Sequence, residues 1–324
     1  MTQRNTLLIG IALLLSFCVI ALGAYVRLSD AGLGCPDWPG CYGHMTVPEQ
    51  AHEQVAAAQA FPDRPVEAHK AWKEMIHRYA AGTLGLLILA IFIRAWRKAE
   101  RAALSPLAPT LLLGTVLFQA ALGMWTVTLL LKPVIVSAHL LGGMTTLSLL
   151  LWIYCREATS PLRASAGLRR WAWLALALVA LQIALGGWVS SNYAALICPD
   201  FPVCRGEWLP ETDFNHAFQF HRELGRTADG ELLSASAMTA IHLTHRLGAF
   251  TVLLVVGGLA FAFRRHEQTR TIGNALLAVL ILQVTLGISN VLLSLPLPIA
   301  VAHNAGAALL LACLVSVVAR LRTQ

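Results

Sequence analysis

Eight long apolar runs dominate the chain, and each has the length needed to cross a lipid bilayer. A spanning helix needs roughly 20 apolar residues, because it rises about 1.5 Å per residue through a hydrocarbon core of about 30 Å. Charged residues make up only 13% of the chain, against about 25% in an average soluble domain. The sequence therefore predicts an all-α membrane protein with eight transmembrane helices and excludes a soluble enzyme. The runs cover approximately residues 6–27, 72–95, 107–130, 134–154, 170–190, 238–262, 272–293 and 297–319.

Basic residues are unevenly distributed among the segments that connect these runs. Because cytoplasmic loops carry an excess of Lys and Arg, we expect both termini in the cytoplasm of a bacterial cell with this protein in its inner membrane. The two long loops, 28–71 and 191–237, are then outside. This topology also explains the net charge of +7 without a nucleic-acid partner. The residues that set the orientation are Arg4, Arg94, Arg97, Lys98, Arg101, Arg156, Arg163, Arg169, Arg170, Arg264, Arg265, Arg270, Arg320 and Arg322.

The two halves of the chain repeat one another, with equivalent positions 163 to 168 residues apart. Each half contains four runs of the same orientation, which is typical of a parallel repeat related by an axis along the membrane normal. We therefore expect two pseudo-symmetric four-helix bundles, over residues 1–160 and 161–324. The matched positions are Gly23 with Gly186, Cys35 and Cys41 with Cys198 and Cys204, His77-Arg78 with His245-Arg246, Gln119 with Gln283, and His139 with His303.

Four runs carry a histidine at matched depth, about five residues after the run begins and so roughly 8 Å below the outer edge. Ionisable groups inside a membrane mark functional sites, and imidazole is a common axial ligand of haem iron in a helix bundle. We expect one haem position between His77 and His139 and a second between His245 and His303. Interior histidines that only bridge helices are one alternative. Zinc is a weaker one, because each pair lacks the third and fourth ligands of a zinc site.

The polar neighbours of these histidines differ between the halves. Arg78 and Arg246 each follow a histidine and are candidate contacts for haem propionates, since arginine binds carboxylates bidentately; snorkelling to the interface is the alternative. Glu74 precedes His77 by three residues on the same helix face, whereas His242 takes the equivalent place in the second half. A carboxylate beside a haem can accept protons or stabilise positive charge. We therefore expect a reaction site in the first half and an electron-transfer haem in the second.

Four of the seven cysteines form two pairs, Cys35/Cys41 and Cys198/Cys204, in the loops expected outside. An oxidising compartment permits disulfides, and the short proline-rich spacing can close a small loop, so we predict two structural disulfides. A redox-active first pair is the alternative. The other three lie in or beside the runs and are predicted to be small buried hydrophobic residues; they are Cys18, Cys155 and Cys313.

Together these residues resemble the haem A synthase family over nearly the whole chain. The resemblance rests on the duplicated halves, the outer Cys35/Cys41 loop, Glu74-Met-Ile-His77-Arg78, Ala138-His139, His245-Arg246 and Ala302-His303.

The resemblance implies an oxidoreductase that converts a ring methyl group of haem O to the formyl group of haem A, through two hydroxylations and loss of water. It further implies haem O as substrate between His77 and His139, with Glu74 as the functional carboxylate. A haem b cofactor would be ligated by His245 and His303. A haem O synthase and cytochrome c oxidase assembly are the implied partners, besides membrane lipid.

Two other functions share the four histidines. A b-type cytochrome with two bis-histidine haems would carry electrons in the membrane and would give Glu74 no role. A haem transporter or chaperone would bind haem exchangeably and leave it chemically unchanged. A homo-oligomer is left open, as are the roles of His242 and of the long second outer loop.

Overall fold

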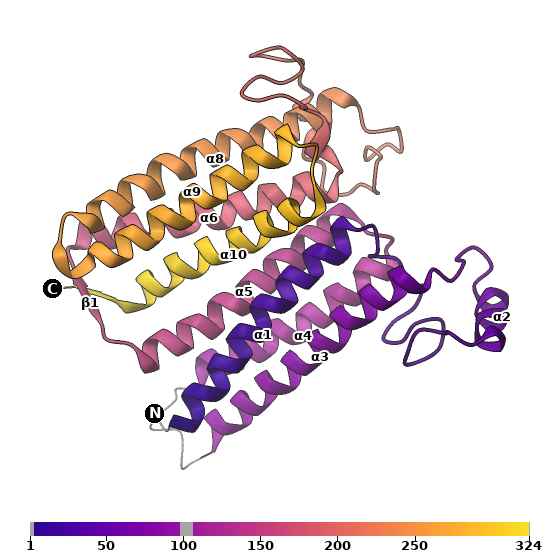
Figure 1. Ribbon diagram of the computed structural model, residues 1–324, viewed down its shortest axis with the longest axis horizontal. Coiled ribbons are helices and arrows are strands. Elements are labelled where there is room, and N and C mark those ends of the chain that lie inside the picture. The colour runs from indigo at the N-terminus through magenta and orange to yellow at the C-terminus, as the bar shows by residue number, and fades with distance from the viewer. Residues whose placement is uncertain (1–2, 98–105, 324) are drawn as a thin grey trace.

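The computed structural model describes residues 3–97 and 106–323, which fold almost entirely into helices (Figure 1). Eight helices in the described residues are long and apolar enough to cross a membrane, which confirms the predicted all-α membrane fold. Lys98 and Arg101, two of the basic residues used for orientation, lie outside the described residues. The long helices are α1 (Gln3–Leu28), α3 (Ala68–Trp96), α4 (Leu107–Thr128), α5 (Pro133–Ala158), α6 (Ala166–Ser191), α8 (Ala235–Arg264), α9 (Arg270–Leu292) and α10 (Leu297–Arg320).

Short elements occupy the loops and the chain end. The two long loops, which the sequence predicts to be the outer loops, contain α2 (Ala51–Ala60), the 3₁₀ helix η1 (Ala194–Leu196) and α7 (Phe214–Ala217). A second 3₁₀ helix, η2 (Glu267–Thr269), precedes α9. Strand β1 (Leu162–Ala164) pairs in parallel with β2 (Leu321–Thr323). The sequence did not predict this sheet, because three residues are too few to establish an alternating pattern.

The helices α3 and α8 begin several residues before their apolar runs, at Ala68 and Ala235 instead of about 72 and 238. The reason is visible at α8, where the Ser234 hydroxyl accepts the N–H of Ala237 at 3.1 Å and so caps the helix. A capping turn is polar, and an apolar run cannot reveal it. Both helices therefore extend past the outer ends of their apolar runs.

Each half of the chain forms a ring of four helices. In the first half α1 and α4 each contact both α3 and α5, and in the second half α6 and α9 each contact both α8 and α10. Figure 1 shows the two sets lying side by side, joined along α1, α5, α6 and α10. A buried apolar cluster crosses this junction, since Ile20 of α1 and Met144 of α5 belong to the same cluster as second-half residues such as Ile183. Within each ring, α3 stands diagonally opposite α5 and α8 opposite α10.

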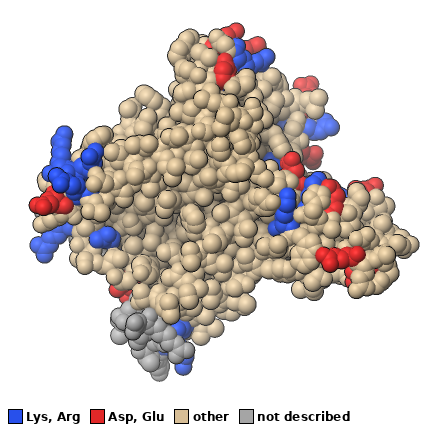
Figure 2. Space-filling model, in the orientation of Figure 1, with Lys and Arg blue, Asp and Glu red and all other residues tan. Residues whose placement is uncertain are grey.

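Charged side chains gather at the two ends of the long helices, and the middle of the face shown in Figure 2 is almost free of Lys, Arg, Asp and Glu. Basic residues occupy the last turns of four helices that end on the same side: Arg94 of α3, Arg156 of α5, Arg264 of α8 and Arg320 of α10. This distribution is that of an integral membrane protein.

The three unpaired cysteines differ in environment. Cys155 is buried and Cys313 is half-buried, but Cys18 is exposed. The prediction that all three are buried was therefore wrong for Cys18. The reason is that both the outside and the inside of a spanning helix are apolar, so hydropathy does not tell which side a residue faces.

Candidate functional site

Each of the four histidines lies against a glycine of the helix that precedes it in its half. A methyl group built on the glycine would lie only 3.0 to 3.3 Å from the Cε1 atom of the imidazole ring. A larger side chain would push the ring aside, because carbon atoms pack at about 3.5 Å or more. The glycines therefore let each ring rest directly on a helix backbone. The pairs are Gly23 with His77, Gly123 with His139, Gly186 with His245, and Gly287 with His303.

The two histidines of each half stand on diagonally opposite helices, His77 on α3 with His139 on α5, and His245 on α8 with His303 on α10. The members of each pair are near enough to influence one another electrostatically. Their pairing as ligands of one iron stays a prediction.

Several ring nitrogens of these histidines are not committed to protein partners. Backbone carbonyls face the rings, but the buried Nδ1 atoms of His77, His139 and His303 have no hydrogen bond of acceptable geometry. A buried nitrogen without a partner is costly, and a bound group is one explanation of it. Neutral imidazoles in such a state suit ligation of an iron between two helices. No group of three or more His, Cys, Asp or Glu residues in the described ranges is arranged to hold a metal ion, as a zinc site would require.

Three of the four histidines also contact a glutamine, and the sequence repeat had matched two of these glutamines, Gln119 and Gln283. Gln119 and Gln182 each donate through Nε2 to the backbone carbonyl of the facing histidine, at 2.9 Å to His139 and 2.9 Å to His245. Gln283 Nε2 lies 3.5 Å from Nε2 of His303. Each glutamine stands four residues before its facing glycine. This Gln-x-x-x-Gly spacing was the signal that could have revealed Gln182.

The position that corresponds to these glutamines beside His77 is Val19. Valine has no side-chain donor, so His77 lacks the glutamine contact that the other three histidines have. Of the two histidines in the predicted reaction site, His77 is therefore the one without a glutamine from the neighbouring helix.

Glu74 is bound to the first outer loop. Its side chain is buried, with 5% of the residue exposed. One carboxylate oxygen, Oε2, accepts the backbone N–H of Cys35 at 3.0 Å, and the other, Oε1, accepts a hydrogen bond from Nη2 of Arg78. Carboxylates buried to this degree require such partners. Each oxygen keeps a further lone pair that can accept a proton or a hydrogen bond.

Arg78 and Arg246 both point to the cysteine loops of their halves. Nη1 of Arg78 donates to the carbonyls of Asp37, Pro39 and Gly40. Arg246 donates to the carbonyls of Val203, Cys198 and Asp200 at 2.8 to 3.0 Å. Their role as propionate contacts stays a prediction.

The counterpart of Glu74 makes a different contact. His242 is buried, with 5% of the residue exposed, and its Nε2 atom accepts a hydrogen bond from Nε of Arg246 at 3.3 Å. The two equivalent positions therefore differ in hydrogen bonding, since Glu74 accepts the N–H of Cys35 in its loop and a bond from Arg78, whereas His242 accepts a bond from Arg246.

Both predicted disulfides are present. Cys35 bonds to Cys41 and Cys198 to Cys204, with S–S distances of 2.04 and 2.00 Å. All four cysteines are buried. The disulfides close the two turns that Arg78 and Arg246 contact.

Comparison with known proteins places the chain. A sequence model of the cytochrome oxidase assembly protein family matches residues 6–315. The chain belongs to this family. It is 48% identical to a haem A synthase of Shewanella oneidensis over 321 residues, which cover 97% of this chain and 96% of the relative. Haem A synthases of Allorhizobium ampelinum and Caulobacter vibrioides are both 28% identical, over 94% and 91% of this chain and 86% and 90% of those relatives.

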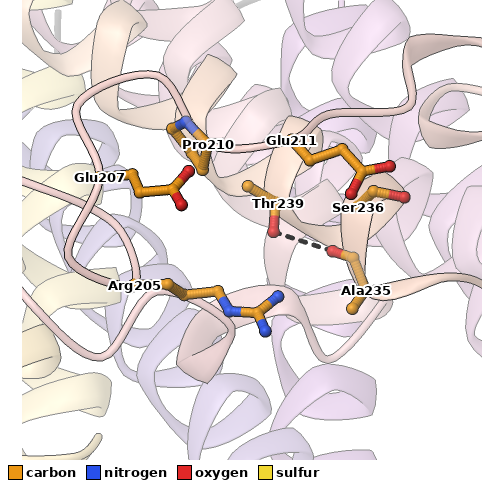
Figure 3. Close-up of a pocket in the computed structure, with 7 residues that line it drawn as sticks. All are labelled: Arg205, Glu207, Pro210, Glu211, Ala235, Ser236 and Thr239. Atoms are coloured by element: carbon orange, nitrogen blue, oxygen red, sulfur yellow. Dashed lines mark hydrogen bonds between the residues drawn. The ribbon is translucent and has the colours of Figure 1, made fainter.

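This family member also has a cavity of about 380 Å³ on its second outer loop, apart from the four histidines. Figure 3 shows Arg205, Glu207 and Glu211 around it, with Thr239 and Ser236 of α8 on one wall. None of the residues predicted for the functional site lines it.

Proposed function

We propose that this member of the cytochrome oxidase assembly protein family converts haem O to haem A, and that the reaction takes place in its first half. The observation that carries the proposal is Glu74. It is a buried carboxylate one helical turn from His77, and the equivalent position of the second half holds His242 instead. The haem A synthases of Shewanella oneidensis, Allorhizobium ampelinum and Caulobacter vibrioides align with 97%, 94% and 91% of the chain.

In the proposal, haem O is held between His77 and His139. Ring nitrogens without protein partners on α3 and α5 support this assignment. The Val19 position supports it as well, because a substrate must enter and leave, and His77 lacks the glutamine tie of the other histidines. A substrate with an isoprenoid tail is apolar enough to reach such a site through the bilayer.

Glu74 is proposed to take up protons as the methyl carbon is oxidised to the level of an aldehyde. A positioned carboxylate can act as such a base, and the guanidinium of Arg78 keeps a positive charge beside it. The first outer loop covers this carboxylate and shields it from bulk water.

The second half is proposed to hold haem b between His245 and His303. Haem b supplies one-electron transfer when it is bound. The hydrogen bond from Gln182 to the backbone carbonyl of His245, at 2.9 Å, supports this assignment because it fixes the backbone of a proposed ligand. The domain division at about residue 160 follows, with substrate chemistry in residues 1–160 and the cofactor in 161–324.

The proposed setting is a bacterial inner membrane with both termini in the cytoplasm and the cysteine loops outside. The basic last turns on one side support this orientation. A haem O synthase would supply the substrate, and cytochrome oxidase assembly would use the product.

The test is expression beside a haem O synthase in cells without their own haem A synthase, followed by extraction and mass analysis of haems. We expect haem A from the wild-type chain and a loss of about 100-fold or more for Glu74→Ala and His77→Ala. Glu67→Ala is the matched control, since this carboxylate stands at the start of the same helix with 47% of its side chain exposed; haem A should persist.

The absorbance spectrum of the protein purified from the same cells tests the proposed haem b site of the second half. His245→Ala should lose the absorbance of co-purified haem b. Unchanged haem A in Glu74→Ala and His77→Ala would refute the reaction site, and haem O that stays unmodified with the wild-type chain would favour a cytochrome or a haem carrier.

A further inference from the structure

We propose that Arg78 is a positioning residue for Glu74, and that Asp37 sets the place of Arg78 by folding the first cysteine turn. This inference rests on the proposed function of Glu74 and gives Arg78 a different role from propionate binding.

The first step is that the Arg78 guanidinium is hydrogen-bonded both to the first cysteine turn and to Glu74. Nη1 donates to the carbonyls of Asp37 and Pro39, at 2.9 and 3.2 Å, and to that of Gly40. Nη2 donates to Oε1 of Glu74. Only 12% of the Arg78 side chain is exposed. One guanidinium thus joins the loop to the carboxylate, using the rigid fork geometry that lysine lacks.

The second step is that the loop holds both oxygens of Glu74. Oε2 receives the N–H of Cys35 directly, at 3.0 Å, while Oε1 is reached through Arg78. Two donors on opposite oxygens fix the plane of a carboxylate, because a single bond would leave it free to rotate about its terminal torsion. The orientation of Glu74 therefore depends on where the loop lies.

The third step is the part of Asp37 in that loop. Its carboxylate accepts the N–H of Tyr42 at 2.6 Å and the N–H of Gly43 at 2.7 Å. Tyr42 has a φ of +53°, a conformation that costs a non-glycine residue free energy and needs support from its surroundings. Asp37 also offers its backbone carbonyl to Arg78. The side chain of Asp37 therefore stabilises the turn whose backbone carbonyls bind Arg78.

The second half provides an internal comparison. Asp200 accepts the N–H groups of Arg205 and Gly206, both at 2.6 Å, and Arg246 donates to the loop carbonyls. Loop closure by aspartate and arginine therefore needs no carboxylate on the helix. Glu74 is the element added in the first half, and there the loop contacts orient a functional group.

The test measures haem O conversion in membranes of cells without their own haem A synthase, at a series of added haem O concentrations. For Arg78→Gln we expect a saturating rate about 100-fold lower, since misplacing a catalytic group by about 1 Å has such an effect, with an unchanged half-saturating haem O concentration. For Asp37→Asn we expect a rate about tenfold lower, because asparagine accepts only one of the two N–H groups. Asp63→Asn removes an exposed charge from the same loop and should match the wild type.

The outcomes separate the possible roles of Arg78. A raised half-saturating concentration with a normal saturating rate would overturn the inference in favour of propionate binding. Wild-type kinetics in Arg78→Gln beside an inactive Glu74→Gln would refute the positioning role alone, whereas full activity in Glu74→Gln would refute the proposed reaction site. Haem b absorbance and an intact Cys35–Cys41 disulfide, measured by mass, show that each variant is folded.

Discussion

The substitution Gly287→Ala tests whether the close packing of the His303 ring on the backbone of α9 supports the proposed ligation of haem b. The added methyl group would lie 3.0 Å from Cε1 of His303. A relaxed carbon–carbon contact is about 3.5 Å, so the imidazole must retreat by about 0.5 Å. Overpacking of this kind costs about 1–3 kcal/mol, and replacing a helical glycine returns up to about 1 kcal/mol. We expect a net loss of stability of about 1 kcal/mol.

The effect on haem b should exceed the effect on the fold. A ligand ring that is displaced loses iron affinity, and a loss of about 1.4 kcal/mol in binding is tenfold in the dissociation constant. The assay is the ratio of co-purified haem b to protein, read from reduced-minus-oxidised absorbance, together with the thermal midpoint. We expect the ratio to fall at limiting haem supply.

The matched control is Gly82→Ala in α3, where a methyl group would have nothing within 4 Å. This variant should keep its haem b and gain up to about 1 kcal/mol of stability. If Gly287→Ala kept a full haem b complement with an unshifted spectrum, the contact between glycine and histidine would have no part in ligation, and the reasoning would be refuted.

Two further predictions concern the second outer loop. Arg222 is 1% exposed and donates to Asn192, His216 and Ala217. Arg222→Ala should lower the stability of the folded loop by about 3 kcal/mol, because buried acceptors lose their donor. Proteolysis of the loop no faster than in the wild type would contradict this. The N–H of Gly206 holds the pKa of Asp200 below its usual value, with a smaller contribution from the N–H of Arg205. The folded turn therefore favours the ionised carboxylate of Asp200. The stability that this carboxylate gives the turn is complete above the usual aspartate pKa and is lost as pH falls through the lowered pKa of Asp200. Hydrogen exchange of the amide groups of Arg205 and Gly206, corrected for intrinsic rates, should accelerate below about pH 4; a pH-independent rate would disprove it.

The membrane fold could be predicted from the sequence, and the histidine pairs could be proposed from it, because both leave regular signals. Apolar runs of bilayer length specify the helices, and the repeat relates His77 to His245 and His139 to His303 without any knowledge of packing. The disulfides follow from spacing and compartment. These features follow from the order of residues along the chain and require no knowledge of contacts between residues that are distant in sequence.

The contacts of Arg78 could not be predicted in the same way. Its partners at the loop are backbone carbonyls, and every residue has one, so no sequence pattern marks those that face a guanidinium. A carboxylate at Glu74 was visible in the sequence, but the N–H of Cys35 that binds it was not. The glycines that face the histidines were hidden for a related reason, because glycine is frequent in spanning helices and its role depends on the neighbouring helix.

The small parallel sheet has a consequence for the order in which the protein is completed. Strand β1 lies between the halves, and its partner β2 stands at residues 321–323, after the last long helix. During synthesis the N-terminal part emerges first. The backbone groups of β1 therefore cannot pair with β2 until the long helices α6, α8, α9 and α10 have been made. The segment before α6 and the segment after α10 are therefore joined to each other only after all four long helices of the second half have been made.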